Sequence, residues 1–336
     1  MTEDHRHDDD RELVRHGDEH AFGVLAERHR GELRVHCYRM LGSLTDAEDL
    51  VQETMLRAWR SRSTYAGRAS ARAWLYRIAT NACLDFLRGH PERVVPVGDG
   101  SAPPPSELPW LQPFPDSLLD GVQPEGMQPD VLAVTRETIE LAYLALIQLL
   151  PPNQRAVLVL RDVLGWSAAE TADLLDTSVA SVTSALQRAR DSLGRHRGGD
   201  DAAVVTSRPT AEERALLGRY MDAHARADAA ALSSMLKEDV RFTMPPQPHH
   251  FVGRTAVGDF IGDSLRNAGA FRLVETTANR SPAAANYLRV PGDDTFRALS
   301  LDVLRIVDGE VAEITTFEPE LFGFFGLPQI WVPRDR

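Results

Sequence analysis

The sequence predicts a multidomain chain: two all-α domains, a helical bundle and a helix-turn-helix, are followed by an α+β domain with a curved sheet wrapped on helices. Three observations lead to this fold class. Apolar residues recur at helical spacing through 10–88, two short helices flank a tight polar turn within 167–197, and alternating apolar runs follow residue 209. The 336 residues leave room for two or three domains.

Composition limits the kind of partner and compartment. A net charge of −12 excludes a protein that coats nucleic acid, so DNA contact must be confined to local basic patches. Cys37 and Cys83 are too few for a disulfide framework and lack metal-ligand spacing. We expect no metal and no cofactor. No apolar run has membrane-spanning length and no signal peptide is visible, which favours a cytoplasmic protein.

The first domain is expected over 10–90, after a disordered tail at 1–9 that is rich in Asp and His. A break at 42–45 precedes a helix for which Asp46 is the expected cap. The outer face of this helix presents an acidic, amide-bearing row suited to a basic partner, although a plain solvated face is the alternative interpretation. The row consists of Asp46, Asp49, Gln52 and Glu53.

The next helical segment changes sign, with six arginines and one acid, Asp85, between positions 60 and 88. Aromatic residues are interleaved with these arginines, which is typical of surfaces that hold a phosphate backbone and stack unpaired bases. Each stacked base contributes about 1–3 kcal/mol. The alternative places the aromatic side chains in the core, and we expect Trp74 and Tyr76 to be divided between core and surface.

A linker is expected over 91–135, where ten of the 21 prolines occur with seven acids and one arginine. Such a segment cannot bury a core of its own and should run extended. Its stretch 108–120 is nevertheless apolar, and an apolar cluster in a polar linker indicates a docking motif. We expect Trp110, Leu111 and Phe114 to pack against a folded surface, with a transient contact to another protein as the alternative.

The second all-α domain is expected over 136–197 and ends in a helix-turn-helix. Ser167 and Glu170 have capping-box spacing and predict a short helix over 168–175. After a polar turn, Thr177 is the expected cap of a second helix. The apolar seam of that helix consists of Val179, Val182, Leu186, Ala189 and Leu193.

The opposite face of this second helix carries hydroxyls near its start and guanidiniums further along. Small groups permit close approach to a major groove, polar tips reach base edges, and cations bind phosphates. An ordinary surface helix of a bundle is the alternative. The residues expected to face DNA are Thr177, Ser178, Ser181, Ser184, Gln187, Arg188 and Arg195.

Three stretches together resemble a known family: DAEDLVQETMLRAWR, RAWLYRIATNACLDFLR and LPPNQRAVLVLRDVLGWSAAETADLL. They resemble the extracytoplasmic-function group of bacterial sigma-70 factors, which keeps only sigma domains two and four. The resemblance covers most of 10–197. It implies a protein that binds core RNA polymerase and directs promoter-specific transcription initiation.

The resemblance also implies roles for matching positions. The acidic row would dock on the clamp helices of the polymerase β′ subunit, and the loop at 65–71 would capture a flipped base of the minus-10 element. The helix-turn-helix would read the minus-35 element and touch the β flap, while the linker would follow the RNA channel. The residues implied for the minus-10 element are Tyr65, Arg68, Arg72, Trp74, Tyr76, Arg77, Asn81, Asp85 and Arg88.

A connection at 198–208 leads to the third domain, 209–336. One long helix is expected over 211–236, then a strand, a second helix and several alternating runs, with a hairpin at Asp308-Gly309. This order resembles the SnoaL-like (nuclear transport factor 2-like) cone fold, whose sheet encloses a pocket. That family includes cyclases, isomerases and many members without catalysis.

Catalysis on this fold would need a side chain that moves a proton. Asp222 and His224 lie two residues apart on a helix and share no face, and we expect His249 and His250 in a solvated proline-rich loop. A regulatory domain, with or without a small ligand, is therefore expected rather than an enzyme. The other candidate residues are Tyr220, Arg241 and Asp259.

The apolar C-terminal tail must cover either the open end of the cone or a sigma domain, and Phe322, Phe325 and Trp331 are its expected docking residues. We expect a sigma factor whose third domain, tail and linker motif hold the two sigma domains closed. Two alternatives stay open. One is a bifunctional protein with a cyclase- or isomerase-like enzyme, and the other is a helix-turn-helix regulator that acts without polymerase.

Overall fold

The computed structural model describes residues 14, 18–67, 69–93, 108–120, 139–196, 208–266 and 268–331. The chain forms two compact units. The first contains the helical residues up to 93 and those from 146 to 196, and the second contains 108–117, 139–145 and 208–331. Part of the expected linker therefore belongs to the same unit as the C-terminal domain.

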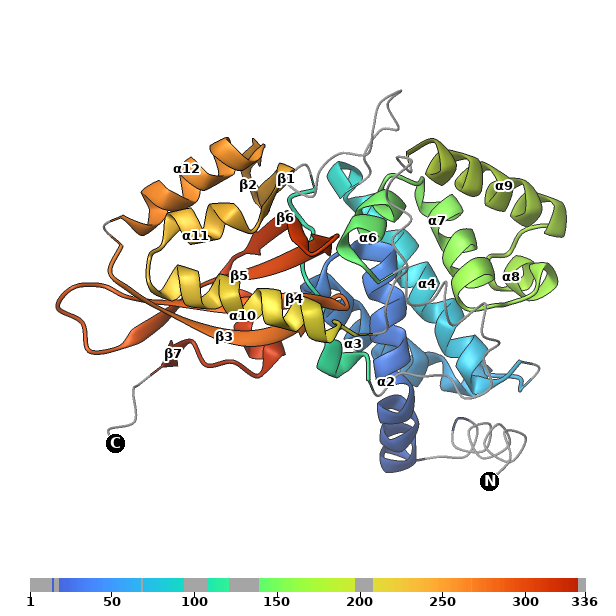
Figure 1. Ribbon diagram of the computed structural model, residues 1–336. Coiled ribbons are helices and arrows are strands. Elements are labelled where there is room, and N and C mark those ends of the chain that lie inside the picture. The colour runs from blue at the N-terminus through green and yellow to red at the C-terminus, as the bar shows by residue number, and fades with distance from the viewer. Residues whose placement is uncertain are drawn as a thin grey trace. The chain divides into compact units, whose positions relative to one another are not determined.

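The first unit begins with a three-helix bundle of α2 (Glu19–Leu41), α3 (Leu44–Ser61) and α4 (Ala71–Gly89), shown in Figure 1. Short 3-10 turns follow α3 and α4, namely η1 (Arg62–Thr64) and η2 (Pro91–Arg93). The cap of α3 is Ser43 and not Asp46 as expected: the Ser43 side chain accepts from the Asp46 backbone N–H at 3.2 Å. Ser43 has the extended backbone that a cap requires, whereas Asp46 already lies in the first turn.

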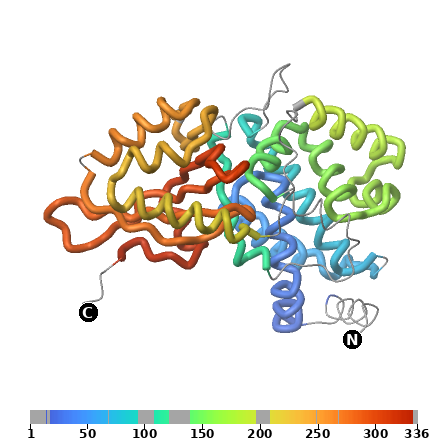
Figure 2. Tube along the Cα trace, viewed as in Figure 1, coloured from blue at the N-terminus to red at the C-terminus, as the bar shows by residue number. Residues whose placement is uncertain are grey.

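The rest of the first unit contains α7 (Pro152–Leu158), the π-helical turn η5 (Val159–Val163), α8 (Ala168–Leu174) and α9 (Val179–His196). In Figure 2, α8, a tight turn and α9 follow one another in the yellow-green trace. The predicted capping box is confirmed, since the Ser167 and Glu170 side chains each accept from the other residue's N–H, at 3.1 and 2.7 Å. The helix α6 (Leu141–Gln148) precedes α7.

Two details of α9 differ from expectation. Its first turn is capped by Ser178 rather than Thr177, because the Ser178 hydroxyl accepts from the Ser181 N–H at 3.1 Å. Val182, Leu186, Ala189 and Leu193 form the buried seam as predicted, but Val179 is 48% exposed because it lies at the open N-terminal end. The apolar seam therefore begins one turn later than predicted.

The second unit is built on one mixed sheet with the order β2-β1-β6-β5-β4-β3, and β7 pairs with β5. The β1–β6 pair is parallel, and the remaining pairs are antiparallel. Figure 1 shows the three helices of the unit on one side of this sheet. The strands are β1 (Leu236–Met244), β2 (Gln247–Val252), β3 (Ala270–Ala278), β4 (Ser281–Arg289), β5 (Phe296–Val307), β6 (Glu310–Phe317) and β7 (Ile330–Trp331).

The single long helix expected at 211–236 is two helices, α10 (Ala211–Ala225) and α11 (Ala229–Ser234). The chain breaks at Ala227, which has φ 53, and the Asp228 side chain then caps α11 by accepting from Ala231 N–H at 3.0 Å. The third helix is α12 (Arg254–Leu265). The histidines expected in a loop, His249 and His250, lie in β2, although both are exposed as expected.

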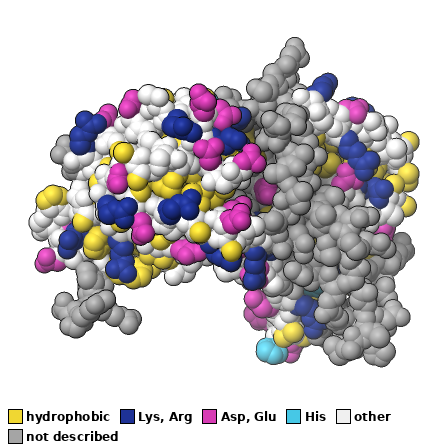
Figure 3. Space-filling view, viewed as in Figure 1, with side chains coloured by type: hydrophobic (Ala, Val, Ile, Leu, Met, Phe, Trp, Pro, Cys, Tyr) yellow, Lys and Arg dark blue, Asp and Glu magenta, His cyan; other side chains and the backbone are white. Residues whose placement is uncertain are grey.

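An apolar core fills the space between these helices and the sheet. Its buried members include Leu217, Val240, Ile261, Leu304 and Ile314. The β5–β6 hairpin turns at Asp308-Gly309 with φ of 54 and 79, as the sequence predicted. On the face shown in Figure 3, basic and acidic side chains of this unit are interspersed, so no large patch of one sign forms there.

Candidate nucleic-acid interface

The acidic row on α3 is exposed at its centre and paired at its ends. Asp49 and Gln52 are exposed. Asp46 forms an ion pair with Arg93 at 2.8 Å, and each of these side chains is only about one-fifth exposed. Glu53 is half-buried and pairs with the arginine four residues later at 2.8 Å. The surface open to a partner therefore centres on Asp49 and Gln52.

The expected minus-10 residues on α4 fall into an outer and an inner group. Ser70 caps the helix by accepting from Ala73 N–H at 3.1 Å, which fixes where α4 begins. Asp85 and Arg88 are exposed, and Trp74, Arg77 and Asn81 are half-buried. Arg68 lies outside the described residues.

Tyr65 belongs to the inner group, although the resemblance implied a base contact for it. It is only 7% exposed, and its hydroxyl donates to the Ala69 carbonyl at 2.6 Å. Its ring lies 5.1 Å from the Trp74 ring. The Tyr65 ring therefore packs against Trp74, which is half-buried and keeps part of its own ring exposed.

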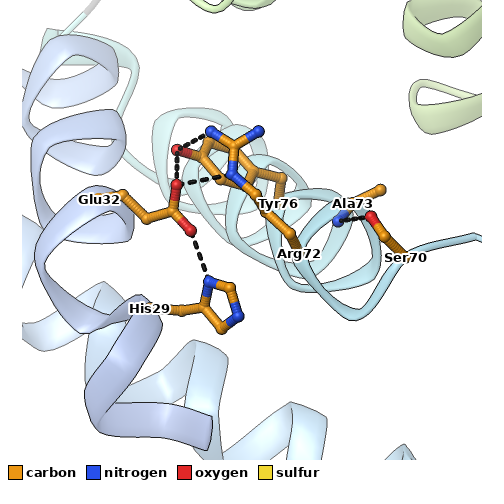
Figure 4. Close-up of polar contacts among 6 residues, drawn as sticks. All are labelled: His29, Glu32, Ser70, Arg72, Ala73 and Tyr76. Carbon is orange, nitrogen blue, oxygen red and sulfur yellow. Dashed lines mark hydrogen bonds and ion pairs between the residues drawn. The ribbon is translucent and has the colours of Figure 1, made fainter. Parts of the chain in front are cut away.

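Arg72 and Tyr76 also point inward, toward α2 (Figure 4). The Arg72 Nε donates to Glu32 Oε2 at 2.7 Å, the Tyr76 hydroxyl donates to the same oxygen at 3.2 Å, and His29 Nδ1 lies 2.5 Å from Glu32 Oε1. Burial raises the pKa of Glu32, but the His29 hydrogen bond and the Arg72 charge outweigh it and the pKa is lowered. Tyr76 is 1% exposed and its hydroxyl donates to the buried carboxylate, so of the two aromatic residues expected to be divided between core and surface, Tyr76 lies in the core.

The charged residues of the outer group have partners of their own. The carboxylate of Asp85 accepts from Arg57 at 3.2 Å and from Arg88 at 3.0 Å, so it orients two guanidiniums. Arg77 Nη2 lies 2.5 Å from Asp176 Oδ1, in the turn between α8 and α9. Arg77 of α4 is therefore paired with the helix-turn-helix.

All seven residues expected to read the minus-35 element lie at the exposed face of the helix-turn-helix. The Ser178 and Ser181 hydroxyls are 2.8 Å apart, and Gln187 donates to Asp191 at 2.8 Å. On the same helix, Arg190 is fixed to Asp162 by two hydrogen bonds of 2.9 and 2.7 Å. The helix is thus anchored on one side and presents short polar groups and arginines on the other.

The apolar linker motif lies in the second unit, where Asn279 holds it. The side chain of Asn279 accepts from Phe114 N–H at 2.7 Å, and its backbone N–H donates to the Phe114 carbonyl at 2.9 Å. Its Nδ2 donates to the Ile139 carbonyl at 2.6 Å, on the other side of the undescribed segment. Phe114 and Asn279 are fully buried, and Trp110 and Leu111 are 9% and 1% exposed.

The hairpin that carries Asn279 is shaped for this contact. Asn279 and Arg280 have φ of 53 and 64, the left-handed pair of a tight two-residue turn between β3 and β4. The Arg280 N–H donates to Asp116 Oδ1 at 2.9 Å, and Pro115 forms a bridge with Ala278. Residues 114–116 therefore lie along the end of the sheet and are bound mainly through backbone groups.

The C-terminal tail folds on its own domain. Its 3-10 segment η6 (Pro319–Phe325) buries Phe322 completely, with the Tyr287 ring 5.3 Å away, whereas Phe325 is half-buried. The Trp331 ring lies 5.8 Å from that of Tyr287, and the Arg272 guanidinium lies 4.2 Å from the Trp331 centroid. The tail was expected to cover either the open end of the cone or a sigma domain. The contacts of Phe322 and Trp331 lie on the sheet of the third domain.

The candidate catalytic residues do not gather in one place. Asp222, Arg241 and Asp259 are exposed on α10, β1 and α12. Tyr220 and His224 do meet, with rings 5.8 Å apart, and burial lowers the pKa of His224. This pair lies beside a polar group that the sequence analysis did not single out.

That group centres on Asp302 of β5, which is 3% exposed. Its carboxylate accepts from the Tyr220 hydroxyl at 2.9 Å, Asn286 Nδ2 at 2.8 Å and the Thr316 hydroxyl at 2.7 Å. These donors come from α10, β4 and β6, so the cluster ties the helix layer to three strands. An aspartate at a helix-facing position of an apolar strand was the signal in the sequence.

No group of three or more His, Cys, Asp or Glu in the described ranges is arranged to hold a metal ion. Among the helices that the structure describes, none is long and apolar enough to cross a membrane.

Comparisons with known proteins cover all three parts of the chain. Family models match sigma-70 region 2 at residues 25–91, sigma-70 region 4 at 140–193 and a SnoaL-like domain at 217–314. The ECF RNA polymerase sigma factor SigG of Mycobacterium tuberculosis is 41% identical over 319 residues, which span 91% of this chain and 84% of SigG. SigJ of the same organism is 29% identical over 300 residues, covering 85% of this chain and 88% of SigJ.

The crystal structure of Mycobacterium tuberculosis SigJ aligns with a TM-score of 0.58 over 91% of this chain and 99% of that chain, at 24% identity, which shows a shared fold. An acidic helix and a basic, aromatic helix thus lie within the match to sigma-70 region 2, and the amphipathic second helix of the helix-turn-helix lies almost wholly within the match to region 4. The chain belongs to the ECF sigma factors of bacterial RNA polymerase, and it carries a SnoaL-like domain at its C-terminal end.

Proposed function

We propose that this sigma factor docks on the β′ clamp helices through α3, reads the minus-10 element with α4 and reads the minus-35 element with α9. The exposed carboxylate of Asp49 and the amide of Gln52 support the docking role because they form the open centre of the acidic row. Seven exposed polar residues at the start and along the outer face of α9 support the minus-35 role.

For the minus-10 element, we propose a smaller contact set than the resemblance implied. Trp74, Asn81 and Arg88 retain exposed surface, and Arg77 would join them once it is released from Asp176. The buried residues beneath them would hold α4 rigid, because a site is precise only when its supporting side chains are fixed. The supporting set is Tyr65, Arg72 and Tyr76.

We further propose that the SnoaL-like domain regulates the sigma domains by holding the linker and has no catalytic role. The observation that carries this is the three-point contact of Asn279 with Phe114 and Ile139. The resemblance implies that the linker of a sigma factor passes through the RNA channel of polymerase. A linker held by Asn279 is not available to that channel, so polymerase must compete with the third domain for it.

Run-off transcription with core RNA polymerase tests this regulation. Asn279→Gly keeps the left-handed turn, since glycine favours positive φ, and removes both side-chain hydrogen bonds to the linker. We expect severalfold more transcript from the variant at limiting polymerase, and equal transcript at saturation.

The matched control is Asp308→Gly, which changes another left-handed residue of the same domain, in the β5–β6 turn. It should transcribe like the wild-type chain. Equal activity of wild type and Asn279→Gly at every polymerase concentration would show that the linker contact does not regulate.

A further inference from the structure

Arg155 joins the two helical parts of the first unit through a buried guanidinium. It lies on α7, has no exposed surface, and donates to oxygens from two separate stretches of chain. Burial lowers the pKa of Arg155 to about 9, and the nearby Cys83 offsets only part of this effect. Within the part of the chain that the structure describes, carbonyl and amide oxygens hold the guanidinium.

One side of the guanidinium is bound within the region 4 part. Nη2 donates to the carbonyls of Gln148 and Leu150 at 2.7 and 3.1 Å, and Nη1 donates to Gln148 Oε1 at 2.7 Å. These contacts stay inside one segment. They would persist if the region 4 part moved away from the region 2 bundle.

The other side is bound at the end of α2. Arg155 Nη1 donates to the Met40 carbonyl at 2.5 Å, and Gln148 Nε2 donates to the Arg39 carbonyl at 3.2 Å. The last carbonyls of a helix have no partner within it, and a cation there also complements the helix dipole. Gly42 permits the close approach, since a Cβ there would lie 3.1 Å from the Gln148 side chain.

A second contact joins the same two parts. Arg77 of α4 pairs with Asp176 in the turn of the helix-turn-helix, and the Tyr76 ring lies 5.4 Å from the Trp166 ring. Asp176 has φ 49, which positions its carboxylate at the apex of that turn. Arg77 belongs to the proposed minus-10 surface, and Asp176 belongs to the helix-turn-helix that is proposed to read the minus-35 element. Their ion pair therefore makes Arg77 unavailable to DNA.

We propose that Arg155 on the end of α2 and Asp176 on Arg77 form a reversible latch that keeps the two sigma regions closed in the free chain, without help from the SnoaL-like domain. The hydrogen-bonding groups of the latch are exchanged for water when it opens, which satisfies the Arg39 and Met40 carbonyls and the charges of Arg77 and Asp176. An apolar seal would not allow this, because separation would expose its whole surface. The consequence for promoter binding depends on the proposed function, but the closure itself does not.

Fluorescence energy transfer in the full chain tests the latch. Dyes are attached to Glu27→Cys on α2 and Gly194→Cys on α9, two open positions, while the buried Cys37 and Cys83 stay unlabelled. In Arg155→Met, the Met40 carbonyl at the end of α2 loses the donor that only the closed state supplies, and we expect the high-transfer population to fall at least fivefold.

Arg190→Met is the matched control, because this arginine of the same region donates to Asp162 and not to α2. It should keep the wild-type distribution. Circular dichroism reports whether each variant is folded.

Arg155 also holds the turn at 148–150, so its variant is paired with Asp176→Asn. Asparagine tolerates positive φ at this position and removes the negative charge that pairs with Arg77. We expect Asp176→Asn to lose less of the high-transfer population than Arg155→Met does. In 1 M salt the high-transfer population should fall in the wild type, which keeps the ion pair, and stay unchanged in Asp176→Asn. The latch is overturned if folded Arg155→Met shows the same energy transfer as the wild type. If Arg155→Met does not fold, wild-type transfer in Asp176→Asn overturns it. Open variants that do not bind core polymerase would instead count against the proposed function.

Discussion

At the residue scale, His36 is a buried group whose charge state sets a pH limit on the region 2 bundle. Its Nε2 lies 2.9 Å from Thr80 Oγ1, and its ring packs edge-on against Tyr76 at 5.0 Å. Burial, followed by the charge of Arg39, lowers the pKa of His36 from 6.5 to about 3. The folded chain therefore keeps His36 neutral, whereas the unfolded chain binds a proton below pH 6.5.

This difference predicts acid sensitivity. A group whose pKa is lowered by folding costs stability as the pH falls below its unfolded value, and here the window runs from 6.5 to about 3. At pH 5 the loss from His36 is about 2 kcal/mol. We expect His36→Gln to remove this slope, measured as urea-dependent hydrogen exchange of α2 and α4 amides between pH 7 and 5. Parallel pH profiles for variant and wild type would contradict the assignment.

The sequence could not show which buried polar side chains are partners of one another. The partners of Arg72 and Tyr76 lie some forty residues away on α2, and Asn279 bonds to Phe114 across 165 positions. Periodicity shows which side of a helix is apolar, but it does not show which polar side chain meets a carboxylate from another helix. For that reason the outer and inner groups of α4 could be separated only in the structure.

At the element scale, the helix-turn-helix was predictable because its signals are local. The capping box of Ser167 and Glu170, the polar turn and the seam of α9 each depend on residues within one or two helical turns. The break between α10 and α11 was missed because alanine at a left-handed position gives no warning. Strand β2 was missed because Pro248 within it, and the two prolines just before it, indicate a loop.

The outer face of α9 gives a quantitative prediction about DNA. Arg188 is exposed, and a phosphate contact from it would release about one counterion. We expect Arg188→Ala to weaken promoter binding by holoenzyme and to lower the slope of log affinity against log salt by about 1.

The control for this measurement is Arg190→Ala on the same helix. That arginine is held by Asp162, so its loss should leave the salt slope unchanged. Identical slopes for Arg188→Ala and wild type would remove α9 from the phosphate-binding surface.

At the scale of the whole molecule, the order of three parts was predictable from composition, but the grouping of the linker was not. Residues 108–117 and 139–145 belong to the same unit as the SnoaL-like domain, although they lie between the two sigma regions in sequence. The apolar motif indicated that the linker docks, and only the Asn279 turn shows where. Because both of these linker segments belong to the unit of the SnoaL-like domain, that domain can act on the sigma regions by holding the linker, without a contact of its own to DNA.

As a sigma factor, the chain is expected to supply promoter recognition to a polymerase that lacks it. The direct measurement is binding of the full chain to core RNA polymerase, coupled to run-off transcription from a promoter library. We predict a stable complex and transcripts from one promoter class, both lost in Asp49→Arg. Absence of binding and of specific transcripts, for the wild type and for Asn279→Gly alike, would contradict the account.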